Sequence, residues 1–196
     1  MSEGIASISP AKPRSAARTR VAHAARAAAG LSPKDVALVR TMKANGNQMP
    51  LRCLIAARSV KLPIALACAL LEQESGGGAN VFGHDPTIFV GAGEVTKAKY
   101  VAYKAQRGPH GKGGMQGVGP VQLTWYAFQD EADRLGGCWK PIVNMKVGFA
   151  RLGDLVRRNG LHAGIKAYNG TGPAADAYAA SVLRRLARWE QILQPQ

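Results

Sequence analysis

The chain has 196 residues, of which 46% are hydrophobic and 6% aromatic, and its formal net charge is +14. This length can bury one sizeable core, and a chain rich in alanine and leucine but poor in aromatic residues favours helices over sheets. No stretch approaches the ~18 uninterrupted apolar residues of a transmembrane helix, and basic side chains interrupt any apolar signal sequence near Met1. We therefore expect neither stable membrane insertion nor a secretory signal.

The positive charge extends over the whole chain. Residues 1–30 hold five basic side chains against one acidic residue, Glu3, which leaves +10 for the remainder. This balance predicts an anionic partner, either nucleic acid, anionic lipid or a polyanionic cell wall. The basic residues are spread over many predicted elements and form no recognition helix, which argues against nucleic acid.

The three cysteines, Cys53, Cys68 and Cys138, lack the spacing of metal ligands, and no phosphate-binding or dinucleotide motif is present. We expect Cys68 to be a small buried hydrophobic residue, and the odd number of cysteines suits synthesis in a reducing compartment. No metal and no organic cofactor is predicted.

Local signals predict a mainly α fold. Residues 1–30 are expected to form a flexible basic arm, and residues 31–196 one ordered domain. Ser32 and Pro33 suit the N-cap and first position of a helix that ends before Gly46. Further helices are predicted at about 51–60, 63–75, 94–106, 126–135, 141–158, 163–168 and 174–193, with the one at 94–106 set in a long irregular stretch, 82–115.

The stretch PIALACALLEQESGGG, from Pro63 to Gly78, carries the candidate catalytic group. Proline suits the first turn of a helix, and three glycines remove the helical bias at its end. Glu74 follows Leu70 by four residues and continues the apolar stripe, whereas Glu72 lies on a weaker stripe. At the point where an apolar helix face meets a glycine turn, the charged form of a carboxyl group is disfavoured, and this raises its pKa. A general acid that works near neutral pH needs such a raised pKa. A capping role for Glu74 explains less, because a carboxylate at a helix C-terminus opposes the helix dipole.

Three stretches resemble the lysozyme superfamily, in which a catalytic glutamate ends a core helix and faces a small sheet or loop lobe. LLEQESGGG is similar to the Glu-Ser motif of lytic transglycosylases and goose-type lysozymes, and AYNGTGPAADAYAASV is similar to their Ala-Tyr-Asn-x-Gly segment. GVGPVQLTW is similar to the Gly-x-Gly-Pro-x-Gln-Leu-Ser/Thr motif of family 19 glycoside hydrolases, which include plant-type chitinases and many phage endolysins. The resemblance implies a lysozyme-like catalytic domain over residues 31–196, with a loop-rich or small β lobe.

The resemblance also implies roles for individual residues. Glu74 would be the general acid, and Ser75, which follows it in the motif, is taken as a substrate-binding residue. Tyr168 and Asn169 would line the cleft, and the hydroxyl of Thr124 would position the attacking water.

The identity of a second catalytic carboxylate stays open. Hydrolysis with inversion needs one roughly 6.5–9.5 Å from the acid. The family spacing favours Glu94 over Asp85, although Glu94 can equally start a helix and Asp85 can form the turn before Pro86. If neither reaches the cleft, the resemblance implies the transglycosylase reaction, in which one glutamate serves as acid and then base and the sugar's own hydroxyl closes a 1,6-anhydro ring.

Four polar and aromatic side chains are candidates for direct sugar contacts. Gln122 and Asn169 suit hydrogen bonds to N-acetyl or hydroxyl groups, or ordinary turn polarity. His84 is a candidate substrate contact or a surface residue beside a turn. For Trp125 both a cleft position facing a sugar and burial in the core are open, and burial is favoured.

Together these features predict an endolysin-like, bacteriolytic glycosidase of bacteriophage type that cleaves the β-1,4 glycan strands of peptidoglycan, with antimicrobial effect. Its basic charge matches anionic cell-wall polymers, and nothing indicates more than a monomer. Without a signal sequence, it is expected to accumulate in the host cytoplasm and to reach the wall after holin-type release. One alternative is a chitinase-type hydrolase of GlcNAc polymers, which cleavage of soluble chitin oligomers would distinguish from a muramidase. The other is a non-enzymatic basic protein that binds nucleic acid or belongs to the virion, and steep salt dependence of binding without glycan cleavage would support it.

Overall fold

The structure is a computed structural model that describes residues 31–83 and 93–194. The chain divides into two units, Met1–Ala37 and Leu38–Gln196, and both the hydrophobic core and the candidate site lie in the second. The basic arm predicted for residues 1–30 lies outside the described residues.

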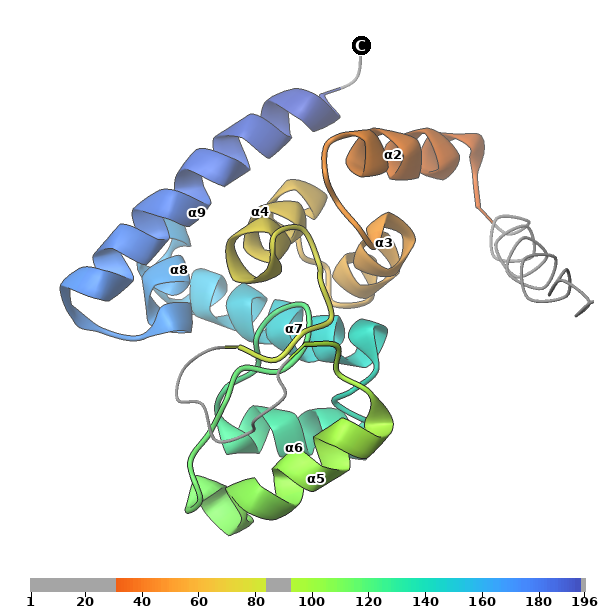
Figure 1. Cartoon of the computed structure of the whole chain (residues 1–196). Coiled ribbons are helices and arrows are strands. Elements are labelled where there is room, and N and C mark those ends of the chain that lie inside the picture. Colours follow the sequence, from red (N-terminus) through yellow and green to blue (C-terminus); the bar gives the residue numbers. More distant parts are fainter. Residues whose placement is uncertain (1–30, 84–92, 195–196) are drawn as a thin grey trace, which may run out of the picture. The chain divides into compact units, whose positions relative to one another are not determined.

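The described part of the chain is mainly α, as the composition predicts (Figure 1). Apart from a short 3-10 turn, Pro109–Gly111, its helices are α2 (Pro33–Ala44), α3 (Pro50–Ser59), α4 (Ile64–Ser75), α5 (Lys97–Arg107), α6 (Tyr126–Arg134), α7 (Pro141–Asn159), α8 (Leu161–Asn169) and α9 (Gly172–Leu193). No helix in these two stretches combines the length and apolarity needed to cross a bilayer.

Side-chain caps and glycines determine where several helices begin and end. At the start of α2, the Ser32 hydroxyl accepts a hydrogen bond from the Asp35 N–H at 3.2 Å, which confirms the predicted cap. The expected helix at 94–106 begins instead at Lys97, because Thr96 caps it and Glu94 forms a bridge with Val81.

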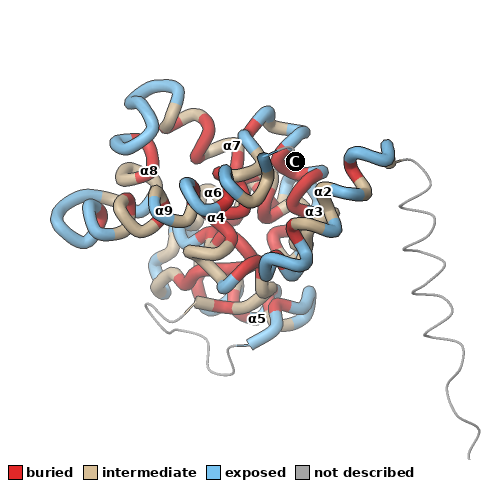
Figure 2. The backbone as a smooth tube through the Cα atoms, turned by 90° about the horizontal axis from the view of Figure 1, so that it is seen from above, coloured by how far each residue is buried: buried red, intermediate tan, exposed pale blue. Residues whose placement is uncertain are grey.

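Helix α4 occupies the centre of the second unit. It packs against α3 and α9, while α7 packs against α3, α6 and α8 (Figure 1). Six consecutive residues of α4, from Leu66 to Leu71, are buried, so the helix is enclosed on all sides rather than along one stripe. Buried positions accordingly concentrate around α4 in Figure 2.

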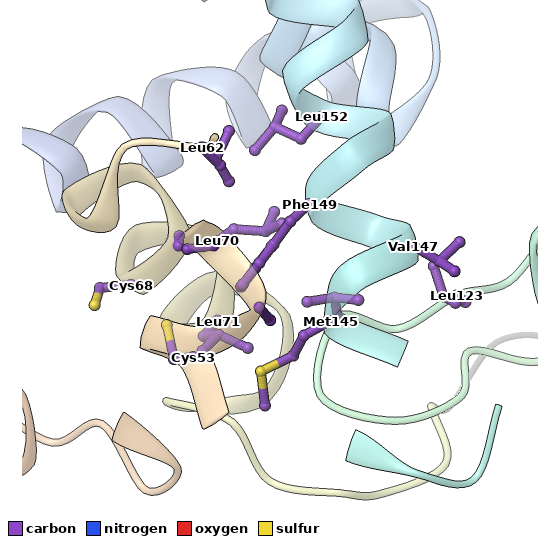
Figure 3. Close-up of a cluster of buried hydrophobic side chains, with 14 of the residues drawn as sticks. Cys53, Leu62, Cys68, Leu70, Leu71, Leu123, Met145, Val147, Phe149 and Leu152 are labelled. Atoms are coloured by element: carbon purple, nitrogen blue, oxygen red, sulfur yellow. The ribbon is translucent and has the colours of Figure 1, made fainter. Parts of the chain in front are cut away.

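The core joins α4 to α7. Phe149 of α7 extends towards Leu70 of α4, with Leu71 and Met145 nearby (Figure 3), and all four side chains are fully buried. Cys53, Cys68 and Cys138 are free and buried, as expected for Cys68. This packing holds the α4 backbone rigidly up to the turn that carries Glu74.

The region between α4 and α7 is loop-rich. Its β pairing, within the described residues, consists of two isolated antiparallel bridges, Val81 with Glu94 and Phe82 with Val118. Buried polar contacts hold this region together, because the guanidinium of Arg107 in α5 donates to Gln129 and Asp130 of α6, each at 2.8 Å. Of the two sequence-based alternatives, the loop-rich lobe therefore describes this part of the chain better than a small sheet.

Candidate active site

Glu74 lies in the last turn of α4, directly before the residue that ends the helix. Gly76 adopts the left-handed conformation there, with φ of 62°, and this turns the chain away from the helix axis. Burial raises the pKa of Glu74 from 4.5 to about 7, against the opposing effect of a hydrogen bond from the Tyr178 hydroxyl of α9. The rise that the sequence predicts for this carboxyl group is therefore present, and desolvation is its main cause.

Tyr178 is suited to remain a hydrogen-bond donor to Glu74. Burial, followed by the neighbouring charge of Glu74, raises the pKa of Tyr178 well above its usual range. A tyrosine that keeps its proton can donate to Glu74 in both protonation states of the carboxyl group, and it donates more strongly to the charged one. Tyr178 thus fixes the orientation of the Glu74 side chain.

Glu74 opens onto a cleft of about 260 Å³. Its lining combines the acid with aromatic, amide, hydroxyl and cationic side chains: Glu74, Met115, Gln122, Leu123, Thr124, Trp125, Phe128, Arg151, Tyr168 and Asn169. The structure thus brings together six of the sequence candidates, Glu74, Gln122, Thr124, Trp125, Tyr168 and Asn169, which come from α4, the loop before α6, and α8. A cleft with an apolar wall and a few convergent polar groups is typical of a ligand-binding site.

The GVGPVQL motif forms one wall of this cleft, and its glycines are needed for close packing. A Cβ at Gly117 would lie 2.4 Å from Oε1 of Gln122, and one at Gly119 would lie 2.6 Å from the Asn144 side chain. The Gln122 amide donates to the carbonyls of Val81 at 3.0 Å and Gly119 at 2.8 Å. Both donors of Gln122 are therefore engaged in holding the loop.

A buried asparagine of α7, Asn144, also holds the loop of the GVGPVQL motif in place. Asn144 donates to the Val118 carbonyl at 2.8 Å and accepts from the Val121 N–H at 3.1 Å. Tyr168 of α8 adds a third contact, because its hydroxyl donates to the Val121 carbonyl at 3.0 Å. The cleft wall is held by helices distant in sequence, which limits its movement relative to Glu74.

The remaining substrate-binding candidates differ in position. Ser75 is not among the residues that line the cleft, and its hydroxyl donates to the Pro120 carbonyl at 2.6 Å, which ties α4 to the motif loop. Thr124 is exposed in the cleft and donates to the Gln122 carbonyl at 3.1 Å. Asn169 is exposed at the end of α8.

The candidates for a second carboxylate do not join the described lining. Glu94 is exposed, pairs with Val81 through the backbone and is not a lining residue. Asp85 and His84 lie outside the described residues. Among the described residues of the lining, Glu74 is the one carboxylate.

Trp125 corrects the favoured expectation of burial in the core. It is 48% exposed, lines the cleft and makes edge contacts with Tyr126 and Phe128. It lies directly before α6, which begins at Tyr126. Sequence reasoning also missed Phe128 and Arg151, whose helical periodicity alone does not mark them as cleft residues.

Glu72, two residues before Glu74, has a different environment. Its carboxylate accepts from the Trp189 indole at 2.9 Å and pairs with Arg188 and Arg185 of α9. Because successive helical residues point about 100° apart, one glutamate is paired with cations while the other faces an apolar wall. Within the described stretches, no cluster of His, Cys, Asp or Glu could hold a metal ion.

Comparison with known proteins adds no assignment. No protein-family model matches the sequence, and searches of curated proteins and of solved structures gave no significant match.

Proposed function

We propose that this protein is a lysozyme-like glycosidase that cleaves the β-1,4 glycan strands of peptidoglycan, with Glu74 as its general acid. The main support is the carboxyl group of Glu74, half-buried beside a cleft and with a pKa of about 7. A carboxylic acid that keeps its proton near neutral pH can protonate the oxygen of a leaving sugar. The motifs around Glu74, Gln122 and Tyr168 resemble those of muralytic enzymes and contribute to the same cleft.

The reaction begins with proton transfer from Glu74 to the glycosidic oxygen. As the bond between this oxygen and the anomeric carbon breaks, positive charge develops on the sugar ring, and the carboxylate left on Glu74 stabilises it electrostatically. Trp125 offers an exposed aromatic face for the apolar side of a sugar ring. The Tyr178 hydroxyl stabilises the carboxylate that remains after transfer.

The second step depends on which nucleophile reaches the anomeric carbon. Water activated by a second carboxylate gives a reducing end, whereas the C6 hydroxyl of the same sugar gives a 1,6-anhydro ring and returns its proton to Glu74. Because Glu74 is the single carboxylate in the described lining, the transglycosylase route needs no further group from this part of the chain. Hydrolysis would require one from elsewhere, and Asp85 remains a candidate.

The wider biological setting follows from the same proposal. A charge of +14 favours adsorption to walls that carry phosphate or carboxylate polymers. An endolysin-like role, with delivery to the wall by a separate holin-type pore, accords with this charge and with the muralytic resemblance.

Mass spectrometry of digested peptidoglycan tests the proposal. Purified sacculi are incubated with the wild-type protein, with Glu74→Gln and with Glu94→Gln, and the released muropeptides are analysed. We expect products from the wild type and Glu94→Gln but not from Glu74→Gln. Anhydro-muropeptides would identify a transglycosylase and reducing ends a hydrolase. Equal cleavage by Glu74→Gln would refute the assignment of the acid.

A further inference from the structure

Arg151 places a positive charge in the cleft that contains Glu74. It lies in the middle of α7, is partly buried, and is a lining residue together with Trp125 and Phe128. Its guanidinium carbon lies 5.3 Å from the centre of the Phe128 ring, a distance typical of a cation–π contact. A contact with an aromatic ring does not neutralise the charge of the guanidinium.

Within the described residues, no hydrogen bond or ion pair joins Arg151 to a carboxylate. The nearest acidic residue along the helix, Asp154, pairs instead with Arg157. Glu74 shares the cleft, but within the described residues its hydrogen-bond partner is Tyr178, and no ion pair joins it to Arg151. A partly desolvated guanidinium without an acidic partner is suited to bind an anion that arrives with a ligand.

We propose that Arg151 is an anion-binding group of the cleft and that, resting on the glycan cleavage proposed above, it selects strands that carry a carboxylate over neutral strands. A guanidinium binds a carboxylate through two parallel hydrogen bonds, which a neutral carboxamide cannot match. Peptidoglycan offers such a group either as the lactyl carboxylate of a muramic sugar without a stem peptide or as a carboxylate of the peptide itself. An unmodified GlcNAc polymer offers none.

The test compares matched glycan strands that differ only in charge. Strands freed of stem peptides by an amidase carry lactyl carboxylates, and a portion of them is converted to neutral carboxamides with carbodiimide and ammonia. Strands with intact peptides, in which the lactyl group is already an amide, form a second pair: one portion keeps its peptide carboxylates, and in the other they are converted to carboxamides in the same way. Cleavage is measured as kcat/KM for each, and binding is measured calorimetrically with Glu74→Gln, which should bind without cleaving.

Arg151→Met is the informative variant, because methionine keeps an unbranched apolar stem against Phe128 while removing the charge. Arg158→Met is the matched control, since Arg158 is an exposed residue of the same helix and does not line the cleft. Arg151→Lys retains the charge without the planar fork, and it provides a second test if the methionine variant does not fold.

For the wild type and Arg158→Met we expect the ratio of kcat/KM on a carboxylate strand to kcat/KM on the matching carboxamide strand to be about ten. One charge-assisted hydrogen-bonded pair is strong enough to give this preference. The preference should fall to about one in Arg151→Met and lie between these values in Arg151→Lys. A preference seen with freed strands identifies the lactyl group, and one confined to intact strands identifies the peptide.

Equal activity of the wild type on charged and neutral strands, or a preference that persists in Arg151→Met, would overturn the role of Arg151 while leaving glycan cleavage intact. If the wild type cleaves nothing but binds charged strands through Arg151, the anion site stands and the glycosidase proposal fails. Absence of both cleavage and charge-dependent binding would refute the two together.

Discussion

Replacing Glu74 with glutamine should stabilise the protein at alkaline pH, although the same change should abolish catalysis. The pKa of Glu74 rises from 4.5 to about 7 on folding, because burial disfavours its charged form. This rise corresponds to about 3 kcal/mol of unfavourable free energy for the ionised carboxylate in the folded state. A neutral amide avoids that cost and can still accept the hydrogen bond of Tyr178.

The stabilisation should depend on pH in one direction. Between pH 4.5 and about 7, the folded protein retains a proton on Glu74 that the unfolded chain has lost, so the free energy of unfolding of the wild type falls as pH rises. Below about pH 4 both states are protonated, and the variant and the wild type should be equally stable. At pH 8 Glu74→Gln should be more stable by up to about 3 kcal/mol, measured by urea unfolding at both pH values.

Glu72→Gln is the matched control, since it is the same substitution two residues away on α4. Glu72 accepts from the Trp189 indole and pairs with Arg185 and Arg188, so its charge is stabilising. We expect this variant to lose about 1 kcal/mol at pH 8, a value kept small because the ion pairs are partly exposed. Destabilisation by Glu74→Gln at pH 8, or an equal gain at pH 4 and pH 8, would refute the desolvation argument.

Three other substitutions test the cleft and its support. Tyr178→Phe removes the donor that favours the charged form of Glu74, so the alkaline limb of the pH–activity profile should move upwards by about one pH unit; an unmoved limb would contradict the contact. Trp125→Ala should raise KM about tenfold, because the sugar loses its stacking surface. It should change the unfolding free energy by under about 0.5 kcal/mol, because the ring is 48% exposed, and a large loss of stability would indicate a core role. Asn144→Leu leaves the Val121 N–H without its partner and should cost about 2–4 kcal/mol in thermal or urea unfolding; a neutral effect would show that the loop is held by other contacts.

Local features of the sequence predict most of the helical framework. Ser32 marks the start of α2 and Gly76 the end of α4, because a cap and a left-handed turn depend on neighbouring residues alone. The position of Glu74 and the rise in its pKa follow from the same short stretch. Glu74 continues the apolar stripe of a helix that ends at glycines, and apolar surroundings disfavour the charged form of its carboxyl group. Thr96 shows the limit of such reasoning, because its cap moved the start of α5 beyond Glu94.

The rest of the site depends on contacts between distant parts of the chain. Tyr178 lies 104 residues from Glu74 and reaches it because α9 packs on α4. Arg151 belongs to a helix whose neighbouring positions are buried, and only the packing of α6 against α7 brings it beside Phe128. The expectation of a buried Trp125 rests on the usual burial of aromatic residues, whereas its exposure is determined by the contacts of the preceding loop with distant helices, which the local sequence does not specify.

The most direct measurement of the central claim pairs the titration of Glu74 with the pH dependence of catalysis. The side-chain carboxyl carbon of Glu74 is followed by carbon-13 NMR, assigned with Glu74→Gln, while kcat/KM for glycan cleavage is measured over the same pH range. Because kcat/KM reports the free enzyme, both should show one transition at about pH 7, with activity falling as Glu74 ionises. A Glu74 resonance that titrates near 4.5 would contradict the account, as would an activity limb that does not coincide with it.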